Sequence, residues 1–318
     1  MKKRKLGRTG IEVSEIAFGG VEIGLPYGIG VKSKTDMLTE SQAVRLLRSA
    51  VDSGINFFDT ARMYGASEAI MGKAFKSMRE QVVICSKCAH LRDETGRLPS
   101  AEKLKRIIEN SLKESLKALQ CEYIDVYLLH QADAEILAND TVKNLFLKFK
   151  EQGLIRAAGV STYETEETKT AIESGAWDVI QLPFNLMNQS HKKHFASAQR
   201  RGIGIMVRSV LFKGILTRKG RNLHPALKKV EDHLKLYNEL LDGSIADLPA
   251  LATKFALSFK EVSSVLVGID RPQYLQNSLT AADGHYLNKK RLARAQELQY
   301  PDPQFLDLVK WDKMGWLT

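Results

Sequence analysis

Eight short apolar runs, each followed by a stretch with helical periodicity, recur along the 318 residues of the chain. The runs cover residues 16–19, 55–59, 82–87, 124–130, 155–161, 179–185, 204–210 and 262–269. Apolar runs of this length are typical of parallel strands that are buried on both faces. Their regular alternation with helices predicts a (β/α)8 TIM barrel. We expect one barrel domain over residues 1–318, because separate domains would break the alternation.

Both ends of the chain extend beyond the eight repeats. Apolar residues alternate around Gly7 and Gly10 in KRKLGRTGIEVSEIAFGG, which predicts a β-hairpin over residues 1–15 that closes the bottom of the barrel. Residues 287–318 follow the last repeat and predict an extra helix and a tail. The tail, FLDLVKWDKMGWLT, contains aromatic residues that favour either a lid over the rim or packing on the barrel wall.

Polar residues mark the start of two predicted helices. Thr39 and Gln42 have the spacing of a capping box, which predicts a helix through residue 51. Ser67 is expected to cap the next helix, and the negative charge of Glu68 would interact favourably with the positive end of the helix dipole.

The charge and apolar content restrict the possible partners. The net charge of +10 and the pI near 9.3 suit anionic ligands. Lys and Arg are spread along the helical segments without an aromatic-interleaved block, so we expect no nucleic-acid partner. No apolar stretch is long enough for a membrane helix, and the N-terminal MKKRKLGRTG lacks the apolar core of a secretory leader. The sequence predicts a cytoplasmic protein.

The three cysteines, Cys85, Cys88 and Cys121, are too few for a disulfide framework in a chain of this size. Cys85 and Cys88 form a C-x-x-C pair, which would suit a redox site. Because residues three apart in a strand point to opposite faces, we expect their sulfur atoms to diverge.

Three successive predicted strands end in an ionisable side chain. Asp59 ends the run 55–59, Lys87 ends the run 82–87 and His130 ends the run 124–130. Tyr64 follows Asp59 by five residues. The carboxyl ends of neighbouring parallel strands lie on one rim, where α/β barrels hold their active sites. We therefore expect these four side chains to converge.

These four residues suit proton transfer to an oxygen atom. Lys87 is expected to favour the phenolate of Tyr64, and Asp59 is expected to hold Lys87 charged and oriented. His130 can donate or accept a hydrogen bond at the same substrate oxygen. The set contains no obvious nucleophile and no metal-ligand spacing. Carbonyl reduction or alcohol oxidation, with a hydride supplied by a cofactor, is the reaction that it predicts.

The same residues lie in motifs that resemble the aldo-keto reductase superfamily. The motifs are FFDTARMYGASEAIMGKAF, the lysine of ICSKC, the histidine of VYLLHQ, GVSTY and QLPFNLMNQ, and the similarity runs in order from Leu6 to about Ala282. The resemblance implies a barrel that binds NAD(P)H across its C-terminal rim. It also implies a catalytic tetrad of Asp59, Tyr64, Lys87 and His130, in which Tyr64 is the general acid in reduction and the base in oxidation.

The resemblance further implies which residues bind the nicotinamide half of the cofactor. Ser161 and Gln181 match contacts to the carboxamide, and Thr162 stands where asparagine is usual. Arg208 occupies the position of an aromatic residue that often stacks on the nicotinamide, and arginine can stack as well. The loop 209–216 would lie near the pyrophosphate, with Ser209, Leu211 and Gly214 as its contacts.

The adenosine end of the cofactor corresponds to VGIDRPQYLQNSL. Gly268 and Tyr274 stand where NADPH-preferring members often have basic residues, and Asn277 and Ser278 replace a usual Glu-Asn pair. Arg271 is the candidate partner of a 2′-phosphate. Asp270 would instead accept hydrogen bonds from a bare ribose and repel that phosphate. NADP(H) follows from the habit of the family, and NAD(H) is the alternative.

Three other hypotheses fit parts of the sequence. A barrel lyase would use Lys87 as a Schiff base, which requires a neutral amine that Asp59 opposes. A catalytically idle regulatory subunit would keep the barrel and bind cofactor without turnover. A metal site would use His191 and His194, which are three apart on a predicted helix, but no third ligand is evident.

The substrate is expected to be a small carbonyl compound or alcohol that binds among the rim loops and the C-terminal tail. The aromatic and sulfur-containing candidates for its pocket are Tyr27, Met63, Trp311 and Trp316. They suit a sugar lactol and a hydrophobic aldehyde equally well.

Overall fold

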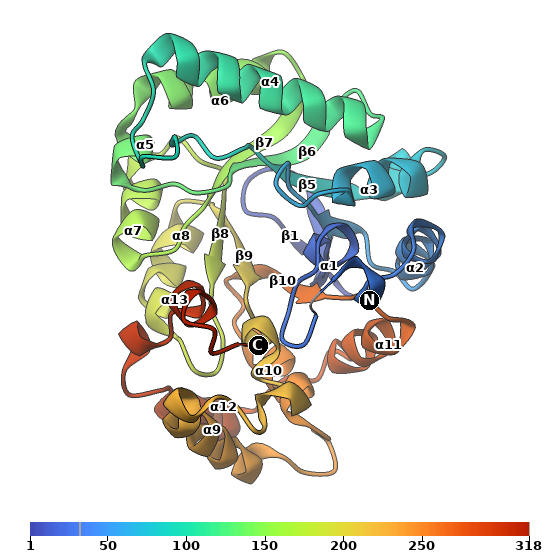
Figure 1. The fold of residues 1–318 in the computed structure, drawn as a ribbon, viewed down its shortest axis with the longest axis vertical. Helices are drawn as coiled ribbons and strands as arrows, with labels where there is room; N and C mark the ends of the chain where they lie inside the picture. The colour runs from blue at the N-terminus through green and yellow to red at the C-terminus, as the bar shows by residue number, and fades with distance from the viewer. Residues whose placement is uncertain (32, 318) are drawn as a thin grey trace.

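A computed structural model of the protein describes residues 1–31 and 33–317. Eight parallel strands form a closed barrel, in which each strand is bonded to its neighbours in the chain and β10 closes onto β3 and β9 (Figure 1). The strands are β3 (Ile16–Gly19), β4 (Phe57–Asp59), β5 (Val83–Lys87), β6 (Ile124–Leu129), β7 (Ile155–Ser161), β8 (Val179–Pro183), β9 (Gly204–Arg208) and β10 (Val262–Gly268). The predicted (β/α)8 barrel is confirmed, and every predicted strand overlaps an observed one.

Helices surround the barrel and follow the strands in chain order. They are α2 (Glu40–Asp52), α3 (Ser67–Phe75), α4 (Ala101–Leu119), α6 (Asp140–Glu151), α7 (Thr165–Ser174), α8 (Phe195–Arg200), α10 (Leu248–Leu257) and α11 (Pro272–Ala281). Shorter helices lie in the connections: α1 (Val21–Gly24), α5 (Ala134–Ala138) and α9 (Lys228–Leu234). In α4, for example, the apolar stripe with Leu104, Ile108 and Leu112 is buried, whereas the charged residues face outward.

The two predicted helix starts differ in outcome. Thr39 and Gln42 form the expected capping box of α2, in which the Thr39 amide donates to Gln42 Oε1 at 2.8 Å. The prediction that Ser67 caps α3 is wrong. Ser67 is already the first helical residue and is buried, and its hydroxyl accepts a hydrogen bond from Thr60 at 2.8 Å instead.

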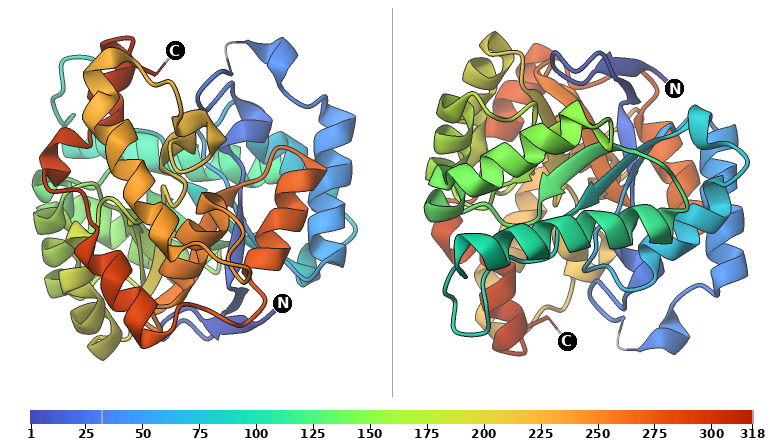
Figure 2. Two further views of the ribbon diagram at one scale, coloured as in Figure 1. Left: turned by 90° about the horizontal axis from the view of Figure 1, so that it is seen from below. Right: turned by 90° about the horizontal axis from the view of Figure 1, so that it is seen from above.

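The N-terminal hairpin closes one end of the barrel. Strands β1 (Lys3–Lys5) and β2 (Glu12–Ser14) are antiparallel. The apolar side chains of this hairpin that are buried are Leu6, Ile11 and Val13. These side chains share one apolar cluster with inward-facing barrel residues, which include Ala17, Phe57, Val83, Cys85, Val126, Leu128, Ala157, Val179 and Met206. Figure 2 shows the N-terminal hairpin at one end of the molecule and the C-terminus at the other. The predicted closure of the barrel bottom is confirmed.

Arg4 joins the hairpin to the last repeat of the barrel. Its guanidinium group donates to the backbone carbonyls of Leu257, Phe259 and Val262 at 2.8 to 3.0 Å. It also forms an ion pair at 2.7 Å with the buried Glu15, whose other oxygen accepts from the Tyr286 hydroxyl. Arg4 therefore connects backbone groups that would otherwise lack side-chain partners at the barrel bottom.

The C-terminal segment contains α12 (Lys289–Glu297) and α13 (Leu308–Lys313). Trp311 on α13 is completely buried, with its ring edge against Phe212 at a centroid distance of 5.7 Å. Residues 303, 304 and 306–309 line the large cavity at the rim. The segment thus combines the two alternatives, because it packs on the protein through Trp311 and borders the cavity through the residues before it.

Candidate active site

The four predicted catalytic side chains lie together at the carboxyl ends of the strands. Asp59 and Lys87 are the last residues of β4 and β5, and His130 follows the last residue of β6. Tyr64 lies in the loop between β4 and α3. Because β4, β5 and β6 are neighbours in one parallel sheet, their ends bring these residues to one place.

Lys87 and Asp59 form a buried ion pair below the cavity. Lys87 Nζ lies 2.7 and 2.6 Å from the two carboxylate oxygens of Asp59 and 2.9 Å from the carbonyl oxygen of Thr60. The side chains are only 1% and 4% exposed. Burial by itself would favour the neutral amine, but the Asp59 carboxylate outweighs it and raises the pKa of Lys87 above its ordinary value. Lys87 is therefore a charged ammonium group.

Tyr64 lies directly over this ion pair. Lys87 Nζ is 4.7 Å from the centre of the Tyr64 ring. Burial raises the pKa of the Tyr64 phenol to about 12, while Lys87 acts in the opposite direction and lowers it. The electrostatic effect of Lys87 has the predicted sign, but burial prevails, so Tyr64 is a protonated phenol at neutral pH.

His130 is neutral in this environment. Burial, followed by the positive charge of Lys87, lowers the pKa of His130 to about 2. Its ring meets the Tyr64 ring edge-on at a centroid distance of 5.5 Å, and it meets the His90 ring in the same way at 4.9 Å. A neutral imidazole keeps one N–H group, which can donate to a carbonyl oxygen.

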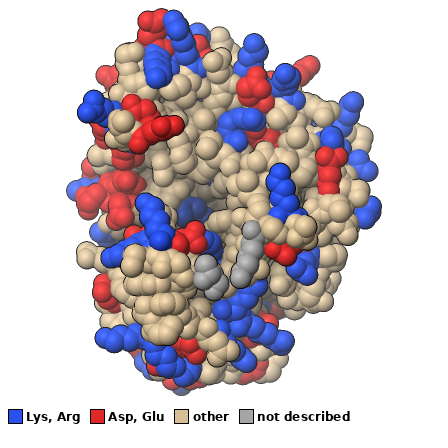
Figure 3. All heavy atoms as spheres, in the orientation of Figure 1, with Lys and Arg blue, Asp and Glu red and all other residues tan. Residues whose placement is uncertain are grey.

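A cavity of about 1740 Å³ opens at this rim, and Figure 3 shows the face of the molecule hollowed at its centre. Its size exceeds that of ordinary small-ligand pockets and suits a long ligand together with a second molecule. Tyr64 and His130 line it, and so do most predicted cofactor contacts, namely Ser161, Gln181, Arg208, Ser209, Leu211, Gly214, Gly268, Asp270 and Asn277. Thr162 and Arg271 lie outside its lining.

Ser161, the last residue of β7, is paired with Gln181 of β8, and both are buried. Gln181 Nε2 donates to Asp59 Oδ1 at 2.8 Å, so the Asp59 carboxylate is held by Lys87 and Gln181 together. This arrangement leaves the Gln181 carbonyl oxygen and the Ser161 hydroxyl for a ligand amide. The pair fits a nicotinamide carboxamide, which both donates and accepts hydrogen bonds.

Thr162 belongs to a different hydrogen-bond chain. Its hydroxyl lies 2.6 Å from that of Thr168, which lies 3.0 Å from His191 Nδ1, and His191 Nε2 lies 3.1 Å from the carbonyl oxygen of Tyr163. Both ring nitrogens of His191 are therefore in use. The described residues contain no cluster of three or more His, Cys, Asp or Glu side chains that could hold a metal ion.

Arg208 faces the cavity at the end of β9. Its guanidinium carbon lies 4.2 Å from the centre of the exposed Tyr163 ring, and its Nη2 atom donates to the carbonyl oxygen of Thr162 at 3.0 Å. No carboxylate among the residues that the structure describes forms an ion pair with it. The contact of Arg208 with a nicotinamide ring remains a prediction.

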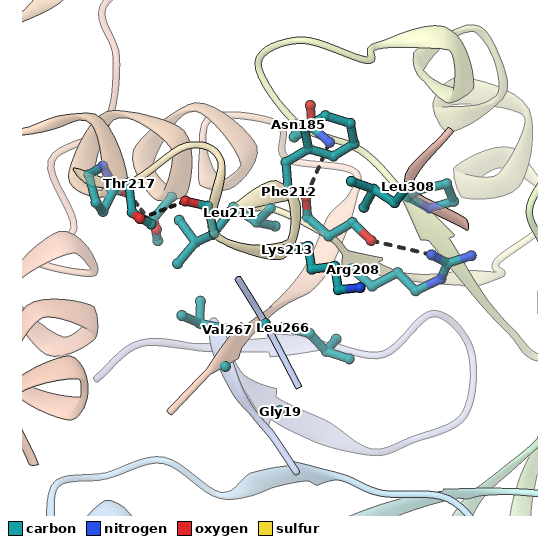
Figure 4. Close-up of a pocket in the computed structure, with 18 of the residues that line it drawn as sticks. Gly19, Asn185, Arg208, Leu211, Phe212, Lys213, Thr217, Leu266, Val267 and Leu308 are labelled. Atoms are coloured by element: carbon teal, nitrogen blue, oxygen red, sulfur yellow. Dashed lines mark hydrogen bonds between the residues drawn. The ribbon is translucent and has the colours of Figure 1, made fainter. Parts of the chain in front are cut away.

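The loop after β9 borders one side of the cavity. Figure 4 shows Leu211, Phe212 and Lys213 on this side, with Gly19 and Val267 of β3 and β10 opposite. Ser209, Phe212, Lys213 and Gly214 all have positive φ angles, of 59°, 49°, 55° and 103°. Three of these four residues are not glycine, so the loop holds a strained backbone of the kind that occurs where a chain clasps a ligand.

The predicted adenosine end divides into two adjoining spaces. Asp270 and Asn277 line the main cavity, whereas Arg271 lines a smaller hollow beside it together with Lys219. Lys219 Nζ donates to the carbonyl oxygen of Ile29 at 2.6 Å. Two cations and the carboxyl group of Asp36 thus line this hollow, whereas Asp270 lines the main cavity.

Only one of the predicted substrate-pocket side chains lines the cavity, namely Tyr27. Met63 is exposed to solvent outside the lining, and Trp311 is buried in the protein. Trp316 stacks on His224, with 6.0 Å between the ring centres. The prediction that Trp311 and Trp316 line the pocket is wrong. The tail lines the cavity through residues that precede Trp311.

Several residues of the site were missed from the sequence. Tyr163, Asn185 and Leu308 line the cavity, and His90 contacts His130. Tyr163 and Asn185 end the motifs GVSTY and QLPFN, so their place at strand ends was a usable indication. Neither His90 nor Leu308 has such an indication, because both come from long connections.

None of the three cysteines is among the residues that line the cavity. Cys85 belongs to the inner apolar cluster and Cys88 to the outer one, so their side chains diverge as predicted. All three cysteines are free thiols. In the parts of the chain that the structure describes, every helix is too short or too polar to cross a membrane.

The chain is similar to known oxidoreductases in sequence and structure. The model of the Aldo/keto reductase family matches residues 15–299. The L-galactose dehydrogenase of Arabidopsis thaliana is 29% identical over 298 residues, which cover 87% of this chain and 87% of the plant protein. The NADH-specific methylglyoxal reductase of Escherichia coli is 27% identical over 309 residues, which cover 88% and 93% of the two chains. The structure of the aldo-keto reductase AKR11C1 from Bacillus halodurans, in its holo form, matches with a TM-score of 0.78 and 26% identity over 96% of this chain and 99% of that one.

Proposed function

The chain belongs to the aldo/keto reductase family, and from this premise we propose that it reduces an aldehyde or ketone to an alcohol with NAD(P)H. In reverse it would oxidise an alcohol or a sugar lactol. One observation carries the proposal: a protonated Tyr64 lies over the charged Lys87 and beside the neutral His130 at the cavity floor. A protonated phenol and a neutral imidazole are the groups that a carbonyl oxygen needs when its carbon accepts a hydride.

Each residue has a separate part in the proposed reaction. The dinucleotide, when bound, supplies the hydride in reduction and accepts it in oxidation. Tyr64 Oη gives its proton to the carbonyl oxygen, and His130 donates a hydrogen bond that orients and polarises this oxygen. Lys87 stabilises the phenolate that remains, because its positive charge lies under the ring. Asp59 keeps Lys87 charged and in place.

The high pKa of Tyr64 keeps the resting protein in the protonation state that reduction needs. A phenol with a pKa of about 12 is a proton donor throughout the physiological range, whereas oxidation requires the phenolate as a base. The sugar lactol is proposed as a reverse substrate because of the similarity to a galactose dehydrogenase.

We assign the nicotinamide carboxamide to Ser161 and Gln181, and the pyrophosphate to the strained loop with Ser209, Leu211 and Gly214. NADP(H) is the proposed cofactor, with its 2′-phosphate held by Arg271 in the hollow that Lys219 also borders. The alternative is NAD(H), because Asp270 faces the main cavity and would accept hydrogen bonds from a bare ribose.

The lyase hypothesis requires a neutral Lys87, and the buried ion pair with Asp59 opposes it. The hypothesis of an idle subunit requires that a bound cofactor is never turned over, which kinetics can test.

The deciding experiment compares the wild-type protein with the Tyr64→Phe variant. We expect the wild type to oxidise NADPH in the presence of small aldehydes. The loss of absorbance at 340 nm measures this oxidation. The variant keeps the ring over Lys87 but has no proton to give, so turnover should fall by about 10²–10⁴-fold. Its affinity for NADPH should stay within about twofold of the wild type.

An inactive wild type that binds NADPH would favour the idle subunit. Unchanged turnover in Tyr64→Phe would remove Tyr64 from the mechanism. Trapping of a covalent adduct by borohydride in the presence of substrate would revive the lyase hypothesis.

A further inference from the structure

Glu22 contributes a carboxyl group to the lining of the cavity, in the part that would hold the proposed cofactor. This part is called the groove below. Glu22 lies on α1, directly after β3. The ends of β3 and β10 are paired at Gly19 and Gly268. A Cβ atom added at Gly268 would lie 2.1 Å from Glu22 Oε1, so the carboxyl group rests directly on the Gly268 backbone. Position 268 can therefore carry no side chain while Glu22 occupies this place.

One oxygen of the Glu22 carboxyl group has no partner among the described residues. Its Oε2 atom is buried and has no hydrogen-bond partner. Within residues 1–31 and 33–317, no Lys, Arg or His side chain forms an ion pair with it. A buried oxygen without a partner is costly, whether it belongs to an acid or to a carboxylate. This oxygen is therefore available for a hydrogen bond with a ligand in the cavity.

The surroundings of Glu22 favour its neutral form. Burial has the largest effect and raises the pKa of Glu22 to about 8. Asp270 and Asp59 raise the pKa further through their negative charges, while Lys219 on the opposite loop and the Glu22 amide lower it. Tyr27 is the other titratable group that faces the carboxyl. At neutral pH Glu22 is therefore mostly a carboxylic acid, which can donate a hydrogen bond.

Glu22 lines the same cavity as Asp59 and Asp270. Its electrostatic neighbours are Asp59, under the nicotinamide position, and Asp270, at the adenosine position. The part of a dinucleotide between these two ends is the pyrophosphate with its flanking riboses. We propose that Glu22 contacts the cofactor as a neutral carboxylic acid that donates a hydrogen bond to a pyrophosphate oxygen. This inference rests on the proposed function, because it needs a dinucleotide in the groove.

The protonation state of the bound Glu22 determines whether the affinity for the dinucleotide falls or rises with pH. An ionised Glu22 would repel the pyrophosphate, so the dinucleotide would bind the protonated protein. Its affinity would then fall by about tenfold for each pH unit above the pKa of Glu22. If an ionised Glu22 instead accepted a hydrogen bond from a ribose hydroxyl, affinity would rise with pH. The two possibilities therefore have opposite pH dependences.

Isothermal titration calorimetry of the full chain with NADPH and with NADH, from pH 6.5 to 9.5 at constant ionic strength, tests the proposal. For the wild type we expect affinity to fall above about pH 8. We also expect the uptake of close to one proton per dinucleotide at pH 9, measured by repeating the titration in buffers with different ionisation enthalpies. Glu22→Gln, whose amide is a neutral donor at every pH, should bind with little change over this range and take up no proton.

Two further variants complete the test. Glu22→Ala has no donor, so its affinity at pH 7 should be about tenfold weaker than that of Glu22→Gln. Asp270→Asn removes a charge that disfavours the ionised Glu22, so it should shift the wild-type pH midpoint to lower pH. Circular dichroism and thermal unfolding establish that each variant is folded.

Affinity that is constant or increases between pH 7 and 9.5 in the wild type would overturn the proposal without any variant. A proton uptake in Glu22→Gln equal to that of the wild type would also overturn it, because the proton would then belong to another group. If neither dinucleotide binds at any pH, the proposed function fails together with this inference. Binding without the pH dependence overturns the role of Glu22 alone.

Discussion

At the end of β5, the Lys87 ammonium group lies between the Asp59 carboxylate and the ring of Tyr64. Burial acts on these residues in different ways. It raises the pKa of Tyr64 and lowers that of His130, which leaves both groups uncharged, while the ion pair keeps Lys87 charged. The ion pair of Lys87 with Asp59 therefore lies under two neutral proton donors. A carbonyl oxygen that gains negative charge would accept hydrogen bonds from both Tyr64 and His130.

At this scale we predict the effect of Lys87→Met. The variant removes the charge that opposes burial at Tyr64, so the phenol becomes a weaker acid and turnover should fall by about 10²–10³-fold. It also leaves Asp59 as an unpaired buried carboxylate, which should destabilise the protein by about 3–5 kcal/mol. Steady-state kinetics and urea unfolding measure the two effects.

The double variant Asp59→Asn with Lys87→Met separates these effects. It contains neither charge, so most of the lost stability should return while turnover stays low. Turnover near that of the wild type in either protein would contradict the assigned role of Lys87.

At the scale of the elements, strands β4, β5 and β6 position the site, and the N-terminal hairpin closes the opposite end of the barrel. The strands were predictable because buried parallel strands consist of continuous apolar runs, and their polar last residues stand out against them. The hairpin was predictable from its glycines and its alternating apolar residues. Helix starts were less predictable, because Thr39 caps α2 as expected, whereas the Ser67 hydroxyl bonds to Thr60 and does not cap α3.

The details of the site depended on contacts that no local pattern contains. Gln181 was predicted as a cofactor contact, but its bond to Asp59 joins residues that are 122 positions apart. Thr162 was predicted to face the cofactor, whereas its hydroxyl lies in the chain that includes His191. Arg271 follows Asp270 directly, yet the two residues border different spaces. Sequence spacing placed these residues at the rim but could not orient their side chains.

The hairpin prediction concerns Arg4. In Arg4→Ala, three backbone carbonyls lose their side-chain donor and Glu15 loses its cation, so we expect a loss of about 3–5 kcal/mol in the free energy of unfolding. Turnover at temperatures where the protein is folded should not change, because Arg4 lies at the far end of the barrel. Urea unfolding gives the stability.

Lys5→Ala is the matched control, because Lys5 is exposed on the same strand. Its unfolding midpoint should equal that of the wild type. Equal midpoints for Arg4→Ala and Lys5→Ala would show that the contacts of Arg4 contribute nothing to stability.

At the scale of the whole molecule, the net charge of +10 favours any anionic ligand, so affinity alone does not identify a phosphate site. Figure 3 shows Lys and Arg mixed with Asp and Glu around the hollowed face. The contribution of a local contact to affinity must therefore be distinguished from the attraction by the net charge. Titrations at two salt concentrations and a control variant that removes a distant charge make this distinction.

We predict that Arg271→Ala weakens NADPH binding by about tenfold, the effect of losing one charge-assisted hydrogen bond, and leaves NADH binding unchanged. Fluorescence titrations at two salt concentrations give both affinities. Arg106→Ala is the matched control, since Arg106 is an exposed residue of α4 and its loss changes the net charge by the same amount.

Equal effects of the two variants would assign the preference for NADPH to the overall charge. Tighter binding of NADH than of NADPH by the wild type would favour Asp270 as the ribose partner and NAD(H) as the cofactor.

The two chain ends differ in how close they lie to the cavity. Residues 303, 304 and 306–309 border the cavity, and Trp311 and Leu317 behind them are buried. The hairpin and the N-terminus lie at the other end of the barrel (Figure 2). An affinity tag or a surface linker therefore belongs on the N-terminus. A fusion partner at the C-terminus would follow a segment that borders the cavity.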